Sequence, residues 1–291
     1  MSHMPKQMAL QALADWWQDM GVETDPGVIK AFAKHMQPSS ASSTALVSDA
    51  YTDKKDVEAV PLRKAGPAPT QLTIGTRRSG GSKSSAEWVE AAQSLAAQAN
   101  TLEALKAAIE GFDGCPLKAG AQNTVVYDGV LQAPIMVIGE GAGGTEDQIG
   151  LPFVGKAGQL LDKMLAAIAC SRKTNTFITN VTYWRPPGNR NPEADELSVC
   201  RPFVDRMIEL NAPKLIIATG GVAAKSLLQT KTGIMRLRGQ WADYTTPSGF
   251  SCPLMPIFHP AYLLRRPQDK SRSWRDLLAI QARFHALDTD A

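Results

Sequence analysis

Short apolar, β-branched runs alternate with longer amphipathic stretches from about residue 84 to the end of the chain. Such an alternation is typical of parallel strands connected by helices. We therefore expect an α/β fold, a three-layer α/β/α arrangement around a central four-stranded parallel sheet. The expected strands are residues 135–138, 177–181, 215–219 and 254–258, and the helices between them cover about residues 157–169, 192–210 and 222–228.

The chain before this alternation has two different textures. Residues 1–36 carry apolar side chains at helical spacing and predict a helical N-terminal segment. Residues 37–83 are rich in Ser, Pro, Gly, Lys and Arg without periodicity, which is typical of a flexible linker. The α/β domain would then cover residues 84–291. The helical segment either packs on this domain or docks a protein partner, and the sequence leaves both open.

Two capping signals mark the start of the expected domain. Ser84 followed by Glu87 has the spacing of a capping box, so a helix is expected to begin there and to run to about residue 99. Thr101 is expected to begin a second helix that ends near residue 110.

Composition excludes some classes of protein. With 291 residues and 44% hydrophobic content, the chain can bury a sizeable core and is not wholly disordered. It has neither an apolar run of 18 residues nor a signal pattern at its start, so we expect a cytoplasmic protein without a membrane span. The net charge of +3 is too small to indicate a nucleic-acid partner. The four cysteines form no CxxC pair, which favours reduced thiols.

Residues suited to chemistry follow each expected strand. The first strand ends in a glycine-rich loop, residues 139–144, where backbone N–H groups can approach a ligand closely. The other strands end in Asn180, in Gly220-Gly221 and in His259-Pro260. Because open α/β sheets bind ligands at the carboxyl ends of their strands, these residues predict one pocket for a flat, polar ligand.

Several sequence blocks occur in the order found in a known family. They are Gly139-Glu140, Glu146-Asp147, Pro152-Phe153-Val154-Gly155, Ile178-Thr179-Asn180, Arg185-Pro186-Pro187 and His259-Pro260-Ala261-Tyr262-Leu263-Leu264-Arg265. Over about residues 100–285 the chain resembles the family 4 uracil-DNA glycosylases. The resemblance implies a monofunctional enzyme of base-excision repair that flips uracil out of single- or double-stranded DNA. Hydrolysis of the N-glycosidic bond would leave an abasic site, and the chain is expected to act as a monomer.

The resemblance implies roles for five residues of this pocket. Gly139, Phe153 and Asn180 would bind uracil: Phe153 offers a face to the ring, and the Asn180 amide can pair with both N3–H and O4. His259 would donate a hydrogen bond to O2, where negative charge grows as the bond breaks. Glu140 would orient or activate the attacking water, or stabilise the cationic sugar.

Further residues of the same blocks have other expected roles. Glu146 and Asp147 are weaker candidates for chemistry, and we expect at least one of them to cap a helix N-terminus. Cations would neutralise phosphates, while the apolar pair Tyr262-Leu263, with Leu264, would fill the gap left by the flipped base. The expected DNA-binding residues are Lys156, Arg185, Arg190, Tyr262, Leu263, Arg265 and Arg266.

The chain departs from the resembled family at an iron–sulfur cluster, which the family holds with four cysteines. Phe112 and Trp184 stand at two of the four positions, and only Cys115 and Cys200 remain. Two thiolates do not hold a four-iron cluster of the usual kind, so we predict neither this cofactor nor another metal. The two aromatic rings could fill the volume of the cluster by apolar packing.

The glycine-rich loop is the second departure. Residues 139–143 read Gly-Glu-Gly-Ala-Gly where the family has Gly-Glu-Ala-Pro-Gly, which loosens the backbone and leaves other deaminated bases open as substrates. Two other classes of protein also stay open. One is a catalytically weak protein that binds DNA damage or abasic sites, and the other is a nucleotide-binding α/β domain that shares only the pattern.

Overall fold

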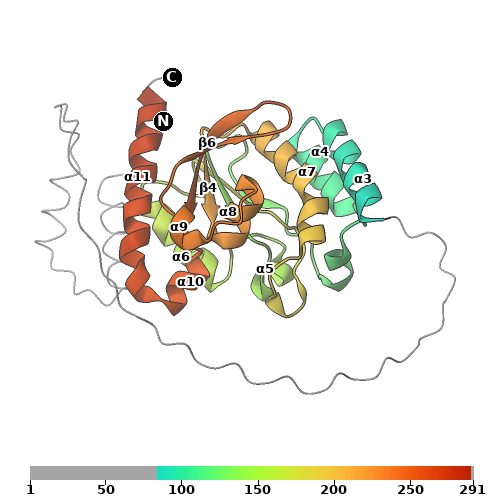
Figure 1. The fold of residues 1–291 in the computed structure, drawn as a ribbon, viewed down its shortest axis with the longest axis horizontal. Helices are drawn as coiled ribbons and strands as arrows, with labels where there is room; N and C mark the ends of the chain where they lie inside the picture. Colours follow the sequence, from blue (N-terminus) through green and yellow to red (C-terminus); the bar gives the residue numbers. More distant parts are fainter. Residues whose placement is uncertain (1–83, 290–291) are drawn as a thin grey trace, which may run out of the picture.

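A six-stranded sheet runs through the middle of the molecule, which this computed structural model describes over residues 84–289 (Figure 1). The strands lie side by side in the order β1-β3-β2-β4-β6-β5. Their bounds are β1 Tyr127–Gly129, β2 Ile135–Gly139, β3 Thr176–Asn180, β4 Leu215–Thr219, β5 Ala242–Thr245 and β6 Ser251–Ile257. The four central strands are parallel, whereas β1 and β5 pair antiparallel at the two edges.

The four predicted strands are confirmed as the parallel centre of the sheet, and the two edge strands are an addition to the prediction. β1 has only three residues, all partly exposed, and β5 has four residues of which only one is buried. Such short, half-exposed strands lack an apolar run, so the sequence pattern does not distinguish them from loops.

The central strands are buried on both faces. Every residue of β2, β3 and β4 is buried. Because side chains alternate along a strand, Met136 and Ile138 contribute to one hydrophobic core, while Ile135 and Val137 contribute to the other. A parallel sheet buried in this way needs helices over both of its faces.

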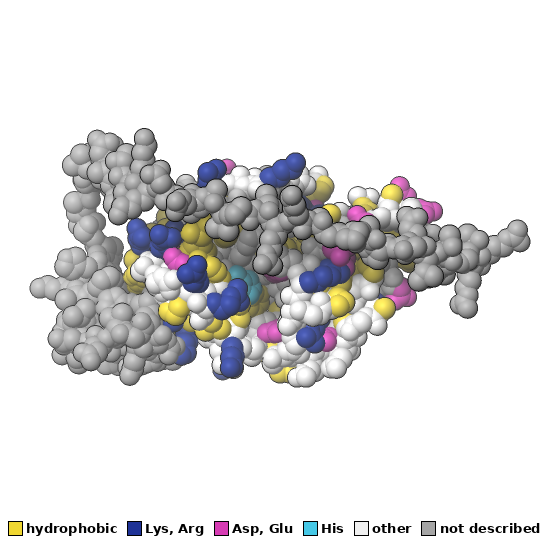
Figure 2. All heavy atoms as spheres, turned by 60° about the horizontal axis from the view of Figure 1, so that its bottom comes forward, with side chains coloured by type: hydrophobic (Ala, Val, Ile, Leu, Met, Phe, Trp, Pro, Cys, Tyr) yellow, Lys and Arg dark blue, Asp and Glu magenta, His cyan; other side chains and the backbone are white. Residues whose placement is uncertain are grey.

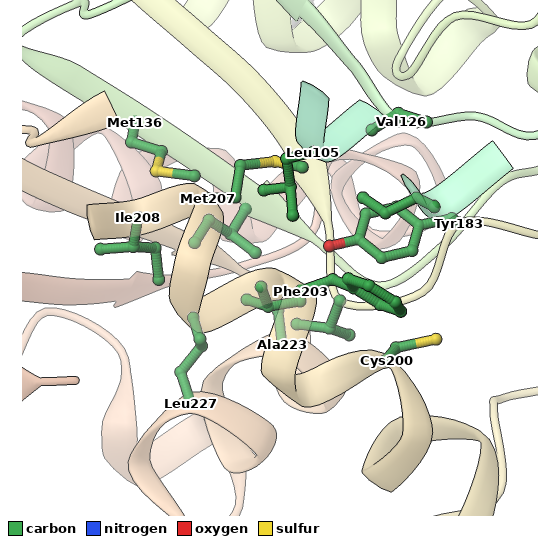
Figure 3. Close-up of a cluster of buried hydrophobic side chains, with 14 of the residues drawn as sticks. Leu105, Val126, Met136, Tyr183, Cys200, Phe203, Met207, Ile208, Ala223 and Leu227 are labelled. Atoms are coloured by element: carbon green, nitrogen blue, oxygen red, sulfur yellow. The ribbon is translucent and has the colours of Figure 1, made fainter. Parts of the chain in front are cut away.

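Helices on the two faces complete the three predicted layers. One core includes side chains of α3 Ser85–Gln98, α4 Leu102–Gly111, α7 Ala194–Asn211 and α8 Gly220–Leu228. Figure 3 shows part of this core, with Phe203, Met207 and Ile208 of α7 beside Leu105 and Ala223. The other core includes side chains of α6 Lys156–Ala166, α10 Pro260–Arg265 and α11 Lys270–Thr289. In Figure 1, α11 lies at the opposite end of the view from α3, α4 and α7.

The remaining elements are short and lie in the connections. They are α5 Gly144–Ile149, α9 Ile234–Leu237, η1 Pro116–Gly120, η2 Pro187–Asn189 and η3 Pro267–Asp269. Both predicted helix starts are confirmed. The Ser84 hydroxyl accepts from the Glu87 N–H at 3.3 Å while the Glu87 carboxylate accepts from the Ser84 N–H at 2.6 Å, and the Thr101 hydroxyl accepts from the Ala104 N–H at 3.1 Å.

The predicted helical segment (1–36) and linker (37–83) lie outside the described residues. Within residues 84–289, none of the helices combines the length and the apolar character that a membrane span requires.

Candidate active site

The carboxyl ends of the parallel strands surround a pocket of about 400 Å³. Glu140 comes directly after β2, and His259 lies two residues beyond the end of β6. The pocket is lined by Glu140, Gly141, Ala142, Gly143, Glu146, Phe153, Ala157, Pro186, Asn189, Arg190, Pro192, His259, Ala261 and Arg265. Of the predicted base-binding and catalytic residues, the structure brings Glu140, Phe153 and His259 to the pocket lining, and the volume lies in the range of small-molecule sites.

Phe153 lines the pocket, whereas Gly139 and Asn180 lie directly behind its ring and do not line the pocket themselves. Gly139 and Asn180 are neighbours in the register of β2 and β3. A Cβ atom on Gly139 would lie 2.4 Å from the Asn180 Oδ1 and 2.5 Å from the Phe153 ring, so only glycine fits there. The Phe153 ring also stacks on His259, with 5.7 Å between the ring centroids.

The Asn180 amide lacks a hydrogen-bond partner. The residue is 1% exposed, and neither Oδ1 nor Nδ2 has a partner among the residues that the structure describes. A buried amide without partners costs free energy, so such a group calls for a partner such as a ligand or a water molecule. Asn180 therefore has an unused hydrogen-bond acceptor and donor beside Phe153 and Gly139.

His259 is held as a neutral imidazole. Burial, and secondarily the Arg265 charge, lower its pKa to about 4, while the Glu146 charge acts in the opposite direction. The Nδ1 atom accepts a hydrogen bond from the Ala261 N–H at 3.1 Å. In a neutral ring with Nδ1 as acceptor, the proton is assigned to Nε2. His259 can therefore donate one hydrogen bond to a ligand without carrying a charge.

Glu140 is the carboxylate that stands closest in sequence to the end of β2, and its side chain lines the pocket. Burial raises its pKa above the ordinary value of a glutamate. Its backbone carbonyl accepts a hydrogen bond from the Thr182 hydroxyl at 3.0 Å, which ties the glycine-rich loop to the end of β3. A partly buried carboxylate with a raised pKa is a better proton acceptor near neutral pH than an exposed one.

Glu146 and Asp147 accept hydrogen bonds from backbone N–H groups of loops and not from the first turn of a helix, so the predicted helix capping is not seen. Glu146 Oε1 accepts from the N–H groups of Val154 and Gly155, at 3.1 and 2.8 Å, directly before α6. Asp147 is buried and accepts from the N–H groups of Gln122 and Asn123. Both carboxylates are therefore engaged with backbone donors, although Glu146 also lines the pocket.

The candidate phosphate-binding cations differ in how free they are. Lys156, Arg265 and Arg266 are exposed, and Arg265 lines the pocket. Arg190 makes a bidentate ion pair with Glu196, and Arg185 donates to Asn189 at 2.7 Å. In Figure 2, Lys and Arg side chains lie on both sides of a hollow in the surface.

The apolar pair next to these cations needs one correction. Leu263 is fully buried in the core between α10 and the sheet, so its side chain cannot fill a gap in DNA in this conformation. Leu264, the next residue, is 45% exposed. The Tyr262 hydroxyl donates to Asp269 at 2.6 Å, and its ring lies against Phe258. The short helix α10 determines which of the two adjacent leucines faces the core, and the sequence pattern does not reveal this.

Sequence reasoning missed two residues that shape the site. Arg172 donates to the backbone carbonyls of Pro152 and Phe153, at 3.1 and 2.7 Å. Gly158 lies so close to this loop that a Cβ atom would be 1.8 Å from the Phe153 carbonyl oxygen. No sequence signal connects Arg172 with a loop about twenty residues earlier, whereas a glycine in the first turn of a predicted helix suggests a close approach of backbone.

The four positions that would hold an iron–sulfur cluster lie in the core that contains α7. Phe112 is 2% exposed and packs edge-on against Trp88 and Phe203. Trp184 is buried and donates from its indole nitrogen to Thr124 at 3.0 Å. Two satisfied aromatic side chains thus stand where two ligands would be needed, so these residues do not fit the cluster.

The two remaining cysteines are buried and free. Cys200 donates a hydrogen bond to Cys115, which lowers the pKa of Cys115 and raises that of Cys200. Among residues 84–289, no three Cys, His, Asp or Glu side chains gather in a way that could hold a metal ion.

Similarity to known proteins places the chain in the DNA glycosylase class of enzymes. Residues 126–278, more than half of the chain, match the family described as the uracil DNA glycosylase superfamily. The chain belongs to this superfamily.

Relatives named type-4 uracil-DNA glycosylase are similar to this chain over most of their own length. The relative from Pyrobaculum aerophilum is 35% identical over 60% of this chain and 91% of its own. Those from Sulfurisphaera tokodaii and Thermotoga maritima are also 35% identical, over 58% and 59% of this chain and 78% and 87% of theirs. The resemblance to family 4 is therefore confirmed.

Proposed function

We propose that the protein is a monofunctional uracil-DNA glycosylase that removes uracil from DNA and leaves an abasic site. The observation that carries the proposal is the buried, unpartnered Asn180 amide beside Phe153 and the neutral His259. The similar proteins named type-4 uracil-DNA glycosylase support the same activity.

Base recognition would depend on Asn180 and Phe153. Uracil presents an N3–H donor next to the O4 acceptor, and the amide oxygen and nitrogen of Asn180 complement both. Cytosine presents the reverse pattern and would leave Asn180 unpaired, at a cost of about 1–3 kcal/mol. The Phe153 ring would stack on the flipped base, as aromatic rings do in other enzymes that act on extruded bases.

Departure of the base would depend on His259. Cleavage of the bond between C1′ and N1 leaves the electron pair on uracil, chiefly as negative charge on O2. The Nε2–H of a neutral His259 can donate to this oxygen, and the hydrogen bond strengthens as the charge grows.

Glu140 would serve the water and the sugar. Water attacks C1′ as the base leaves, and the Glu140 carboxylate accepts the proton that the water loses. The same negative charge would stabilise the cationic sugar in the transition state. No lysine is among the side chains that line the pocket in the described part of the chain, which supports hydrolysis without a Schiff base.

DNA would lie across the exposed cations around the pocket. We assign phosphate contacts to Lys156, Arg265 and Arg266, which are exposed and near the pocket. Arg185 and Arg190 are engaged within the protein and would instead shape the loop of residues 185–192, which also lines the pocket. Leu264, in place of Leu263, is the exposed apolar side chain that could enter the gap left by the flipped base.

The cluster-free state is part of the proposal. The buried rings of Phe112 and Trp184 support it, since they occupy two positions where the resembled family has cluster ligands. The proposed roles of Asn180, His259 and Glu140 use no metal ion.

An excision assay tests the proposed function. Purified protein is incubated with single- and double-stranded oligonucleotides that carry one uracil, and abasic sites are revealed by alkaline cleavage. Matched oligonucleotides with thymine or cytosine at the same position are the controls. We expect cleavage only of the uracil strands. Binding to uracil or abasic DNA without excision would favour a damage-binding protein, and neither binding nor excision would contradict both.

A further inference from the structure

Phe153 has an unfavourable backbone conformation at the site. Its φ angle is +54°, in the left-handed region that few residues other than glycine adopt. Strained residues of this kind cluster at functional sites and persist only where the surrounding structure holds them. This conformation places the Phe153 ring on His259 and against Gly139, so it shapes one side of the pocket.

Arg172 donates hydrogen bonds to two carbonyl groups of the loop that contains Phe153. Its Nη2 donates to the Phe153 carbonyl at 2.7 Å, and its Nη1 donates to the Pro152 carbonyl at 3.1 Å. The guanidinium is in turn fixed by Asp128 on β1, at 2.7 Å, and by Asp162 on α6, at 2.8 Å. The planar fork of arginine can make all four bonds at once, whereas lysine cannot.

Glu146 holds the same loop through its backbone N–H groups, because it accepts hydrogen bonds from those of Val154 and Gly155. Gly158 completes the fixation, because its lack of a side chain lets α6 approach the Phe153 carbonyl. Four consecutive residues of the loop, 152–155, are therefore each held by a charged side chain through a backbone group. Arg172 differs from Glu146 in that it does not line the pocket.

We propose that Arg172 is a positioning residue, which keeps the Phe153 ring in the orientation that stacks on the flipped base. The proposal rests on the proposed function, because the ring has this role only if a base enters the pocket. Arg172 also connects the edge strand β1 and the helix α6 to the loop, so the geometry of the pocket depends on ion pairs behind it. Without Arg172, two carbonyl groups lose their donors and the left-handed conformation of Phe153 loses its main support.

The central experiment compares Arg172→Met with a matched control, Arg201→Met. Arg201 is similarly buried, with 21% of its side chain exposed against 14% for Arg172, and it also binds a carboxylate and a backbone carbonyl. It lies on α7 and makes these contacts with α7 and α8, away from the loop. A second control, Asp162→Asn, weakens one support of Arg172 but leaves both carbonyl bonds.

We expect Arg172→Met to lower the single-turnover excision rate by about 10- to 100-fold, since small displacements of reacting groups have effects of this size. The inhibition constant of free uracil should rise, while the affinity for abasic-site DNA, which offers no base to stack on, should stay within about twofold. Arg172→Lys should recover part of the rate. Both control variants should keep rates close to that of the wild-type protein.

Hydrogen exchange gives a readout that does not depend on activity. In Arg172→Met, the amides of Val154 and Gly155 should exchange faster than in the wild-type protein, and in Arg201→Met they should not. An unchanged excision rate in Arg172→Met, or an equal loss in Arg201→Met, would overturn the proposal. If the wild-type protein removed no uracil, the proposed function would fail. In that case, unchanged hydrogen exchange in Arg172→Met would also refute the role of Arg172 in holding the loop.

Discussion

His259 can act as a neutral donor because burial, helped by the charge of Arg265, lowers its pKa to about 4. We expect His259→Ala to lower the single-turnover rate of uracil excision by about 100-fold, or ~2.7 kcal/mol, the usual effect of removing one transition-state donor. The affinity for DNA should change little, because this hydrogen bond strengthens only as charge builds on O2. Near-full activity in the folded variant would refute the leaving-group role.

The pH dependence of the reaction should be determined by Glu140. A general base works only when it is ionised, and burial raises the pKa of this carboxyl. As the pH falls, excision should therefore decline at a higher pH than the ordinary glutamate value of about 4.3 would give. His259, whose pKa is about 4, protonates later.

The pH profile of the single-turnover rate, measured for the wild-type protein and for Glu140→Gln, tests this assignment. The variant should be slower at neutral pH, and its rate should not show the decline at acidic pH (the acid limb of the profile). If the limb persists in Glu140→Gln, another group is responsible for it.

Gly139 can be tested by the smallest possible change. In Gly139→Ala, the added methyl group would lie 2.4 Å from the Asn180 Oδ1 and 2.5 Å from the Phe153 ring, so at least one of them must move. We expect excision to fall by about 10-fold or more, because the Phe153 ring or the Asn180 amide would be displaced. Gly120→Ala is the matched control, because a Cβ atom there has no neighbour within 4 Å. Equal activity of both variants would contradict this prediction, since Phe153 and Asn180 would then tolerate the added methyl group.

At the scale of elements, the short helix α10 connects the core to the proposed DNA face. Leu263 anchors it in the core, while Leu264, Arg265 and Arg266 are exposed. The helix follows His259 directly, and the Pro260 ring at its first turn suits a helix start. Its exposed residues are therefore held at a fixed position relative to the pocket.

Replacement of Arg265 and Arg266 by alanine should weaken binding to duplex DNA and reduce its salt dependence. Each lost phosphate contact should lower the slope of log K against log salt concentration by about 0.9. Titration of a fluorescent duplex at several salt concentrations measures this slope. Lys106→Ala, on α4, is the control and should leave the slope unchanged. A slope unaffected by the double substitution would remove α10 from the DNA interface.

At the scale of the whole molecule, aromatic side chains fill the core around α7. Phe112 packs against Phe203, 5.1 Å away between ring centroids, and Trp184 packs against Tyr183. Figure 3 shows Cys200 beside Phe203 and Tyr183 in this core. In the proposed cluster-free state, this apolar packing would take the place of the cluster of the resembled family.

We expect the purified protein to be colourless and to contain no stoichiometric iron, because only two thiols remain at the four positions. Iron analysis and the visible absorption spectrum of protein prepared without oxygen measure this directly. Treatment with a chelator should leave both folding and excision unchanged. A brown preparation with several irons per chain would contradict the cluster-free state.

Much of this architecture follows from local sequence signals. The strands β2, β3, β4 and β6 are apolar runs between helical stretches, and their ends bear Glu140, Asn180 and His259. Because parallel strands end at the same edge of a sheet, the site could be predicted once the strands were recognised. The edge strands β1 and β5 could not, since short and half-exposed segments carry little periodicity.

The sequence by itself determined the order of the elements, the edge at which chemistry is possible and the residue types available there. Only the tertiary structure decided that Leu263 faces the core, that Arg190 is paired with Glu196, and that His259 is neutral. It also decided that Arg172 holds the loop of Phe153 from the far side of that loop. The physical reason is that burial, pairing and pKa depend on neighbours brought together by long-range packing, whereas the sequence pattern reports only the periodicity of each segment.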